Sequence, residues 1–244
     1  MPQEFRDAYR KGIDEGWLST SCRPEHGGMG VPIFFQAVTW AEFGTSTCMA
    51  LSVLPALSIG VYEVLRANGR QDLIDYFATN LASGEWAGTM CLTEPHAGTD
   101  LGIITTKATP QDDGTYRVSG TKIFITYGEH DMAENIVHLV LAKAPDAPEG
   151  SRGISLFLVP KHLPKEWESG GMGGISHDLS GELNGITCSG SEGKMGLHAS
   201  PTCVMNFDDS VGWLVGPLHG GMPLMFQMMN RERVATGMMG LGLA

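Results

Sequence analysis

The 244-residue sequence has little positive charge. Its 16 lysines and arginines face 27 aspartates and glutamates, which gives a formal net charge of −11. No basic stripe is available to neutralise the phosphates of a nucleic acid, so the composition excludes a nucleic-acid partner. Any cationic site for a smaller anionic ligand must therefore be local.

The spacings of cysteine and histidine that form disulfide frameworks or metal sites are also missing. The five cysteines are odd in number and include no C-x-x-C, and the eight histidines form no H-E-x-x-H. Such unpaired thiols are typical of proteins in a reducing compartment. We therefore expect no metal and a cytoplasmic location.

Long apolar runs are absent as well. The longest one, Cys48 to Tyr62, contains Pro55 and is shorter than the roughly 20 residues that a membrane-spanning helix needs. The polar start, MPQEFRD, lacks the features of a secretory signal. With 42% hydrophobic and 18% charged residues, the chain has the composition of a folded protein without a membrane span.

The pattern of apolar residues changes once, near Glu85. Helical periodicity before this point predicts helices at 5–17, 33–43, 49–67 and 70–83. Short runs separated by turns predict strands at 86–92, 103–109, 116–126, 136–142, 154–159, 186–195 and 202–207. From about Leu218 an apolar stripe at helical spacing, Met222, Met225, Phe226 and Met229, predicts a further helix. No βαβ alternation appears, so a doubly wound nucleotide-binding fold is excluded.

Two short motifs offer groups that suit a flat heterocyclic ligand. The first, MCLTEPHAGTD at 90–100, gathers small hydroxyl residues and free backbone N–H groups around a bend at Pro95. The second, GTKIFIT at 120–126, follows a turn at 112–114 and reads as the second arm of a hairpin. Alternation along that strand places Phe124 and Thr126 on one face. A ring beside a hydroxyl donor fits the edge of a flavin.

Together, T-E-P-x-A-G-[ST]-D and G-x-K-x-[aromatic]-I-T resemble the acyl-CoA dehydrogenase family. The resemblance covers the whole chain, which looks truncated at both ends relative to family members. It implies an α+β multidomain fold with an incomplete helical domain at 1–84 and a β-barrel-like domain at 85–215. Residues 216–244 would be the first helix of a C-terminal helical bundle.

The resemblance also implies a reaction and a set of partners. The enzyme would be a flavoprotein that converts an acyl-CoA thioester to a 2-enoyl-CoA with FAD as cofactor and electron-transfer flavoprotein as acceptor. Family members form oligomers when complete. Two alternatives remain at this stage: an acyl-CoA oxidase that uses oxygen, and a non-catalytic flavin-binding fragment.

Matching the motifs residue by residue assigns a cofactor site. The residues expected along the flavin and its diphosphate are Met90, Leu92, Thr93, Gly98, Thr99, Phe124 and Thr126. Thr99 would also approach the pantetheine of CoA. The family often has Trp where Phe124 stands, so the stacking ring is smaller here.

The last predicted helix supplies the substrate contacts. Asn230 and Arg233 are spaced i, i+3 and share a face, and they match a family pair that contacts CoA. Glu232, directly before Arg233, stands where a few branches of the family place the catalytic base. Most members use a later glutamate, and the alternative for Glu232 is an ordinary ion pair with Arg231 or another surface cation.

A Gly-, Ser- and Pro-rich segment at 161–185 interrupts the strands. A flexible insertion explains it better than a phosphate-binding loop, because no helix or Lys-Ser/Thr follows it. Together with the Lys-Met-Gly that comes after it, the insertion resembles the branch that includes the 3-methylmercaptopropionyl-CoA dehydrogenases.

Overall fold

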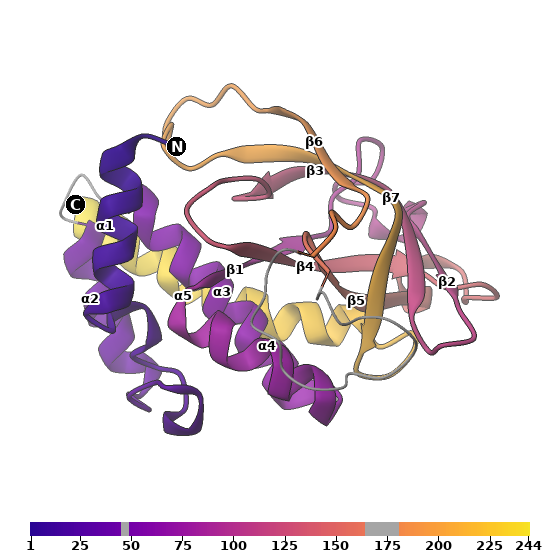
Figure 1. Ribbon diagram of the computed structural model, residues 1–244. Helices are drawn as coiled ribbons and strands as arrows, with labels where there is room; N and C mark the ends of the chain where they lie inside the picture. Colours follow the sequence, from indigo (N-terminus) through magenta and orange to yellow (C-terminus); the bar gives the residue numbers. More distant parts are fainter. Residues whose placement is uncertain (45–48, 164–180) are drawn as a thin grey trace.

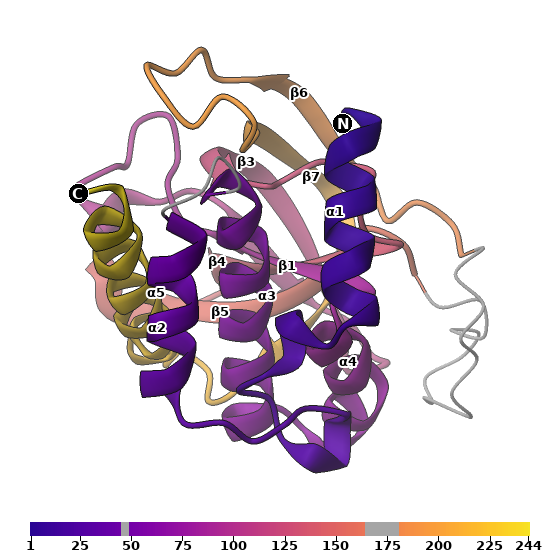
Figure 2. The ribbon, with the colours of Figure 1, turned by 90° about the vertical axis from the view of Figure 1, so that its left-hand side faces the viewer.

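The computed structural model describes residues 1–44, 49–163 and 181–244. The helices gather on one side of the molecule and the strands on the other (Figure 1). The described helices are α1 Gln3–Asp14, α2 Ile33–Gly44, α3 Met49–Asn68, α4 Gln71–Ser83 and α5 Gly221–Leu243. Viewed from the helical side, α5 and α2 stand beside α3 (Figure 2). The helices therefore form one layer, and α3, α4 and α5 pack against the strands.

The breaks between the helices follow from local backbone chemistry. α1 is followed by Gly16 in the left-handed region at φ 74°, where a residue with a side chain would be strained. α3 ends at Asn68, and α4 begins after Gly69 and Arg70, as the Asn-Gly pair predicts. α4 in turn is capped by Gly84 at φ 88°. None of the described helices is long and apolar enough to cross a membrane.

The strands form one sheet that closes on itself. The strands are β1 Trp86–Cys91, β2 Lys107–Pro110, β3 Tyr116–Thr126, β4 Asn135–Lys143, β5 Ile154–Pro160, β6 Ile186–Ser191 and β7 Thr202–Val215. β4, β2, β3, β7 and β5 follow one another in the ladder, and β5 pairs back onto β4. β1 joins β4 in parallel, while β6 extends β7. The expected barrel-like β region is confirmed.

Three expected strand boundaries are wrong. The strand predicted at 103–109 is instead the 3-10 turn η3 Leu101–Ile103 followed by β2. The Asp100 carboxylate accepts from the Gly102 N–H and caps that turn. The N–H groups of Thr105 and Thr106 then donate to the side chain of Glu94. A side chain has replaced the ladder partner, which a period-2 pattern does not reveal.

The other two errors lie at β6 and β7. β6 ends at Ser191, short of the predicted residue 195, and β7 continues to Val215, beyond the predicted residue 207. β7 is long because it pairs in turn with β6, β3 and β5. Those late pairings bury Trp213 and Val215 against the helices.

Helix α5 covers the end of the core with a face slightly different from the predicted stripe. Leu224, Met225 and Met228 are buried, whereas Phe226 is 42% exposed. The predicted helix is confirmed, but its apolar stripe is rotated, because the contacts with α2 and α3 decide which side of the helix is buried.

Candidate functional site

The first motif leaves the end of β1 and turns across the end of β3. Met90, Leu92 and Thr93 are half-buried, and Gly98 and Thr99 are exposed. The Ile123 N–H donates to the Thr93 carbonyl oxygen over 2.9 Å, so the two motifs are hydrogen-bonded to each other. The structure thus brings together the segments that the sequence assigned to one site.

A buried ion pair lies directly behind this junction. Lys122 is fully buried, and its Nζ donates to Glu94 Oε1 at 2.8 Å and to the Leu92 carbonyl oxygen at 3.0 Å. Glu94 is 2% exposed and also accepts from the backbone N–H and the hydroxyl of both Thr105 and Thr106. Five donors therefore surround one carboxylate.

These contacts decide the charge of the pair. Burial alone would raise the pKa of Glu94, but the hydrogen bond and charge of Lys122, with the donors from Thr105 and Thr106, lower that pKa to about 2. Burial lowers the pKa of Lys122, and the bond to Glu94 opposes this shift. The Glu94 carboxylate is therefore ionised at neutral pH, and it lies 2.8 Å from Lys122 Nζ. The sequence analysis missed this pair, although both residues stand inside the motifs.

Phe124 interrupts the regular strand geometry. It has φ 60° and lies where the β3–β7 register shifts between Lys122 and Ile125. A positive φ is rare for a bulky residue and marks a bulge. The simple alternation used to place Phe124 and Thr126 on one face does not run through this point. The bulge instead leaves the Phe124 ring 57% exposed.

The exposed groups of the two motifs fit a flavin by their chemistry. In the described part of the chain, the hydroxyls of Thr93, Thr99 and Thr126 have no hydrogen-bond partner. At Gly98 an added Cβ would meet no atom within 4 Å, so the loop is open there. Free hydroxyls, an open glycine and an exposed ring match the polar edge and apolar face of such a ring system.

Glu232 lies on the helical side, where α5 faces α3. Its Oε1 is buried and has no hydrogen-bond partner among the described residues. A Cβ at Gly60 of α3 would be 2.8 Å from Met228 Cγ and 3.1 Å from this oxygen, so Glu232 packs closely against the α3 backbone at this glycine. Burial raises the pKa of Glu232 to about 7, and the charge of Arg231 opposes the shift only in part. In the described ranges Glu232 forms no ion pair, contrary to the alternative of an ordinary surface pair.

The neighbouring cations of α5 point elsewhere. Arg231 donates through Nη2 to Ser21 Oγ at 2.5 Å and to Gln36 Oε1, and so fastens α5 to α2 and the preceding turn. Arg233 is exposed; it donates to Asn230 Oδ1 at 2.9 Å and lies 5.6 Å from the centre of the Phe226 ring. The expected sharing of one face by Asn230 and Arg233 is confirmed.

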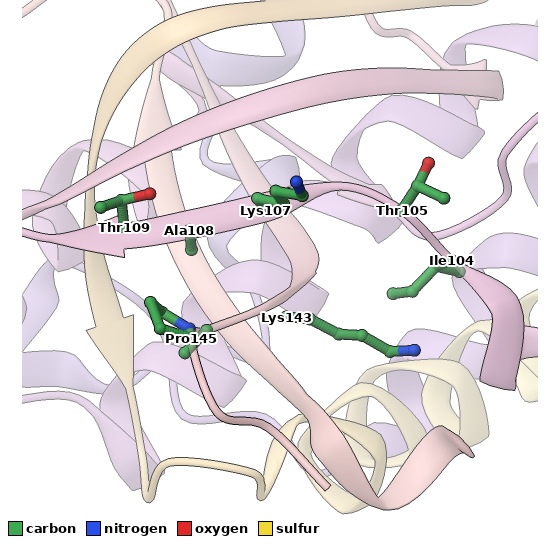
Figure 3. A pocket seen from close by; sticks show the side chains of 8 residues that line it. Ile104, Thr105, Lys107, Ala108, Thr109, Lys143 and Pro145 are labelled. Carbon is green, nitrogen blue, oxygen red and sulfur yellow. The ribbon is translucent and has the colours of Figure 1, made fainter. Parts of the chain in front are cut away.

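A cavity of about 500 Å³ lies next to the buried pair, between β2 and the loop after β4. Lys143 extends across its floor toward Ile104 (Figure 3), and its Nζ donates to the Gly102 carbonyl oxygen at 2.6 Å. Thr105 belongs both to this cavity and to the donors of Glu94. No sequence pattern had indicated the cavity.

Two expectations concern features away from this site. Among the residues described, no cluster of three side chains is suited to hold a metal ion. The glycines at 170–174 of the predicted insertion lie outside the described residues.

Comparisons with known proteins converge on one family. The family description "Acyl-CoA dehydrogenase, middle domain" matches residues 89–210, which include both motifs. The 3-methylmercaptopropionyl-CoA dehydrogenase of Ruegeria pomeroyi is 46% identical over 244 residues, which are 100% of this chain and 40% of that protein. A butyryl-CoA dehydrogenase of Syntrophomonas wolfei is 40% identical over 254 residues, 99% of this chain and 39% of that protein.

Solved structures agree with the fold. The acyl-CoA dehydrogenase from Geobacillus kaustophilus superimposes with a TM-score of 0.78 at 26% identity, over 98% of this chain and 56% of that chain. The chain thus spans about two fifths of the length of these curated relatives.

Proposed function

Since the chain belongs to the acyl-CoA dehydrogenase family, we propose that it provides the flavin-facing wall of an enzyme that removes two hydrogens from an acyl-CoA thioester. The product would be a 2-enoyl-CoA. The observation that carries the proposal is the exposed Phe124 ring at its bulge, two residues before the half-buried Thr126, whose hydroxyl has no described partner.

The cofactor would be FAD, which accepts a hydride from the β-carbon of the acyl group when bound. Phe124 would pack against the flavin while Thr126 donates to its edge. Met90, Leu92 and Thr93 would lie along the pyrimidine side, and Gly98 and Thr99 at the diphosphate. The open space at Gly98 supports the last assignment, because a phosphate needs close approach to backbone N–H groups.

The substrate contacts would come from Thr99, Asn230 and Arg233. Arg233 Nη1 donates to Asn230 Oδ1, and this hydrogen bond holds the guanidinium on the exposed face of α5. Such a cation would offset the net negative charge of the chain for an anionic CoA ligand.

Glu232 is the candidate base for the α-proton. A base for a weakly acidic proton works best with a pKa near neutrality, and burial gives Glu232 a pKa of about 7. Its Oε1 is buried and has no hydrogen-bond partner among the described residues. A later glutamate, as in most of the family, is the competing candidate, and Glu232→Gln separates them: flavin reduction near the wild-type rate would exclude Glu232.

The acceptor would be electron-transfer flavoprotein, and a cytoplasmic location would suit thiols that are free at Cys22, Cys91, Cys188 and Cys203. The test is anaerobic mixing of the complete FAD-loaded protein with acyl-CoAs of increasing length. We expect loss of flavin absorbance and reduction of the acceptor. Stoichiometric peroxide in air would indicate an oxidase instead, and flavin that no acyl-CoA reduces would indicate a non-catalytic flavin protein.

A further inference from the structure

Lys122 controls the direction of a peptide unit in the flavin-facing segment. Its Nζ holds the Leu92 carbonyl oxygen at 3.0 Å on the β3 side. No described peptide bond is cis, so the Thr93 N–H points opposite to that carbonyl. This N–H has no backbone partner outside the strands in the described chain. Holding the Leu92 carbonyl toward Lys122 therefore turns the Thr93 N–H away from Lys122.

The carboxylate of Glu94 balances the charge of the Lys122 ammonium that holds the Leu92 carbonyl. Lys122 is buried against Glu94 with 0% and 1% of the two side chains exposed. A buried charge without its partner acts over several ångströms, because little solvent screens it. The pair as a whole is neutral, so the flavin-facing segment stands in front of a dipole and not in front of a net charge.

We propose that Lys122 and Glu94 form a charge-balanced positioning pair: Lys122 orients the Thr93 N–H toward the flavin, and Glu94 cancels the effect of the ammonium on the reduction potential. The inference rests on the proposed function, since it requires flavin at this wall. Neither residue touches the reacting atoms. Both act through the Leu92–Thr93 peptide and through the electrostatic field.

The two halves of the pair predict opposite electrostatic effects. Glu94→Gln leaves a buried positive charge, which favours the more electron-rich reduced flavin and makes the potential more positive. Lys122→Met leaves a carboxylate that still has four donors from Thr105 and Thr106, and makes the potential less positive. If the pair only stabilised the fold, the two substitutions would not shift the reduction potential in opposite directions.

The experiment compares the complete FAD-loaded wild type with Glu94→Gln, Lys122→Met and the double variant. Reduction potential and FAD dissociation constant are measured for each. We expect opposite potential shifts for the single variants and a potential near wild type for the double variant. FAD binding should weaken about tenfold in Lys122→Met, the equivalent of one oriented hydrogen bond.

The pair Lys161–Glu129 is the matched control. It is also a lysine–glutamate pair of the β region, but its side chains are 20% and 33% exposed. Lys161→Met and Glu129→Gln should leave potential and FAD affinity unchanged. Shifts of the same sign in Glu94→Gln and Lys122→Met, or no shift, would overturn the proposal. If Lys122→Met does not fold, an unchanged potential in Glu94→Gln alone overturns it.

The outcomes separate this inference from the proposed function. A complete protein that binds no FAD would contradict the proposed function. A protein that binds FAD and is reduced by acyl-CoA, yet lacks opposite shifts, would contradict only the positioning pair.

Discussion

Two carboxylates of this molecule, each with a buried oxygen, have opposite surroundings. Glu94, in the β region, accepts from five donors, and its pKa is about 2. Glu232, between α5 and α3, has a buried oxygen that no described group contacts through a hydrogen bond, and its pKa is about 7. Burial acts on both. The number of donors decides whether a buried carboxylate is fixed as an anion or can exchange a proton.

The nearest cations explain the difference. Lys122 Nζ lies 2.8 Å from Glu94 Oε1, and among the described residues it donates only to that carboxylate and to the Leu92 carbonyl oxygen. Arg231 adjoins Glu232 in sequence, but its Nη2 donates to Ser21 Oγ and Gln36 Oε1 instead. A folded chain rarely leaves a buried polar atom unsatisfied without compensation. We call the surroundings of Glu94 the satisfied region and those of Glu232 the unsatisfied region. In the unsatisfied region a ligand that donates a hydrogen bond to Glu232 Oε1 would gain binding free energy.

The largest expected effect comes from removing the cation of the satisfied region. Lys122→Met leaves Glu94 buried without its counter-ion, and we expect the free energy of unfolding to fall by about 3–5 kcal/mol. Chemical denaturation followed by circular dichroism measures this. Replacing both partners, Lys122→Met with Glu94→Gln, should cost less than the single change, because no uncompensated charge remains.

The matched control is again Lys161→Met. Its pair with Glu129 is partly exposed, so the loss should stay within about 1 kcal/mol. Equal losses of unfolding free energy for the two lysine variants would show that the Glu94–Lys122 pair behaves like a surface ion pair. That result would contradict the contrast between Glu94 and Glu232.

The second prediction concerns the pH dependence of stability. The folded pKa of Glu232, about 7, is above the usual 4.5. Its protonated form therefore contributes stability that is fully present below pH 4.5 and is lost as the pH rises through about 7. We expect the unfolding free energy of the wild type, relative to Glu232→Gln, to fall by about 2 kcal/mol between pH 5 and pH 8.

The sign for Glu94 is the reverse. Its folded pKa is lowered to about 2, so its contribution is present above its ordinary pKa of 4.5 and is lost as the pH falls toward 2. Because each pH profile is compared with that of a variant changed at a single carboxylate, the difference isolates that carboxylate. A flat difference between wild type and Glu232→Gln across pH 5–8 would mean that Glu232 is solvated.

The sequence predicts the helices, the strands and the contact between the two motifs, but it does not predict the surroundings of Glu94 or of Glu232. The helical third, the β region and the contact between the two motifs follow from periodicity and motif spacing, because local patterns and nearby pairings generate them. The Glu94–Lys122 pair joins residues 28 apart, and the bulge at Phe124 depends on register with β7. The slot at Gly60 for Glu232 depends on how α3 and α5 cross. Such features arise only when distant elements are packed together, so residue patterns alone do not reveal them.

The smallest expected effect on stability is that of Thr126→Val, and Thr106→Val is its comparison. Thr106 donates to Glu94 Oε1 at 2.6 Å, whereas Thr126 has no described partner for its hydroxyl. Thr106→Val should lower the unfolding free energy by about 1.5–3 kcal/mol, the range for hydrogen bonds to charged groups. Thr126→Val should leave the stability of the flavin-free protein within about 0.5 kcal/mol of wild type and weaken flavin binding by about 0.5–1.5 kcal/mol, one neutral hydrogen bond. Denaturation without FAD and titration with FAD give the two numbers for each variant. Unchanged flavin affinity, spectrum and potential in Thr126→Val would remove this hydroxyl from the flavin wall, because the substitution keeps the shape and deletes only the donor.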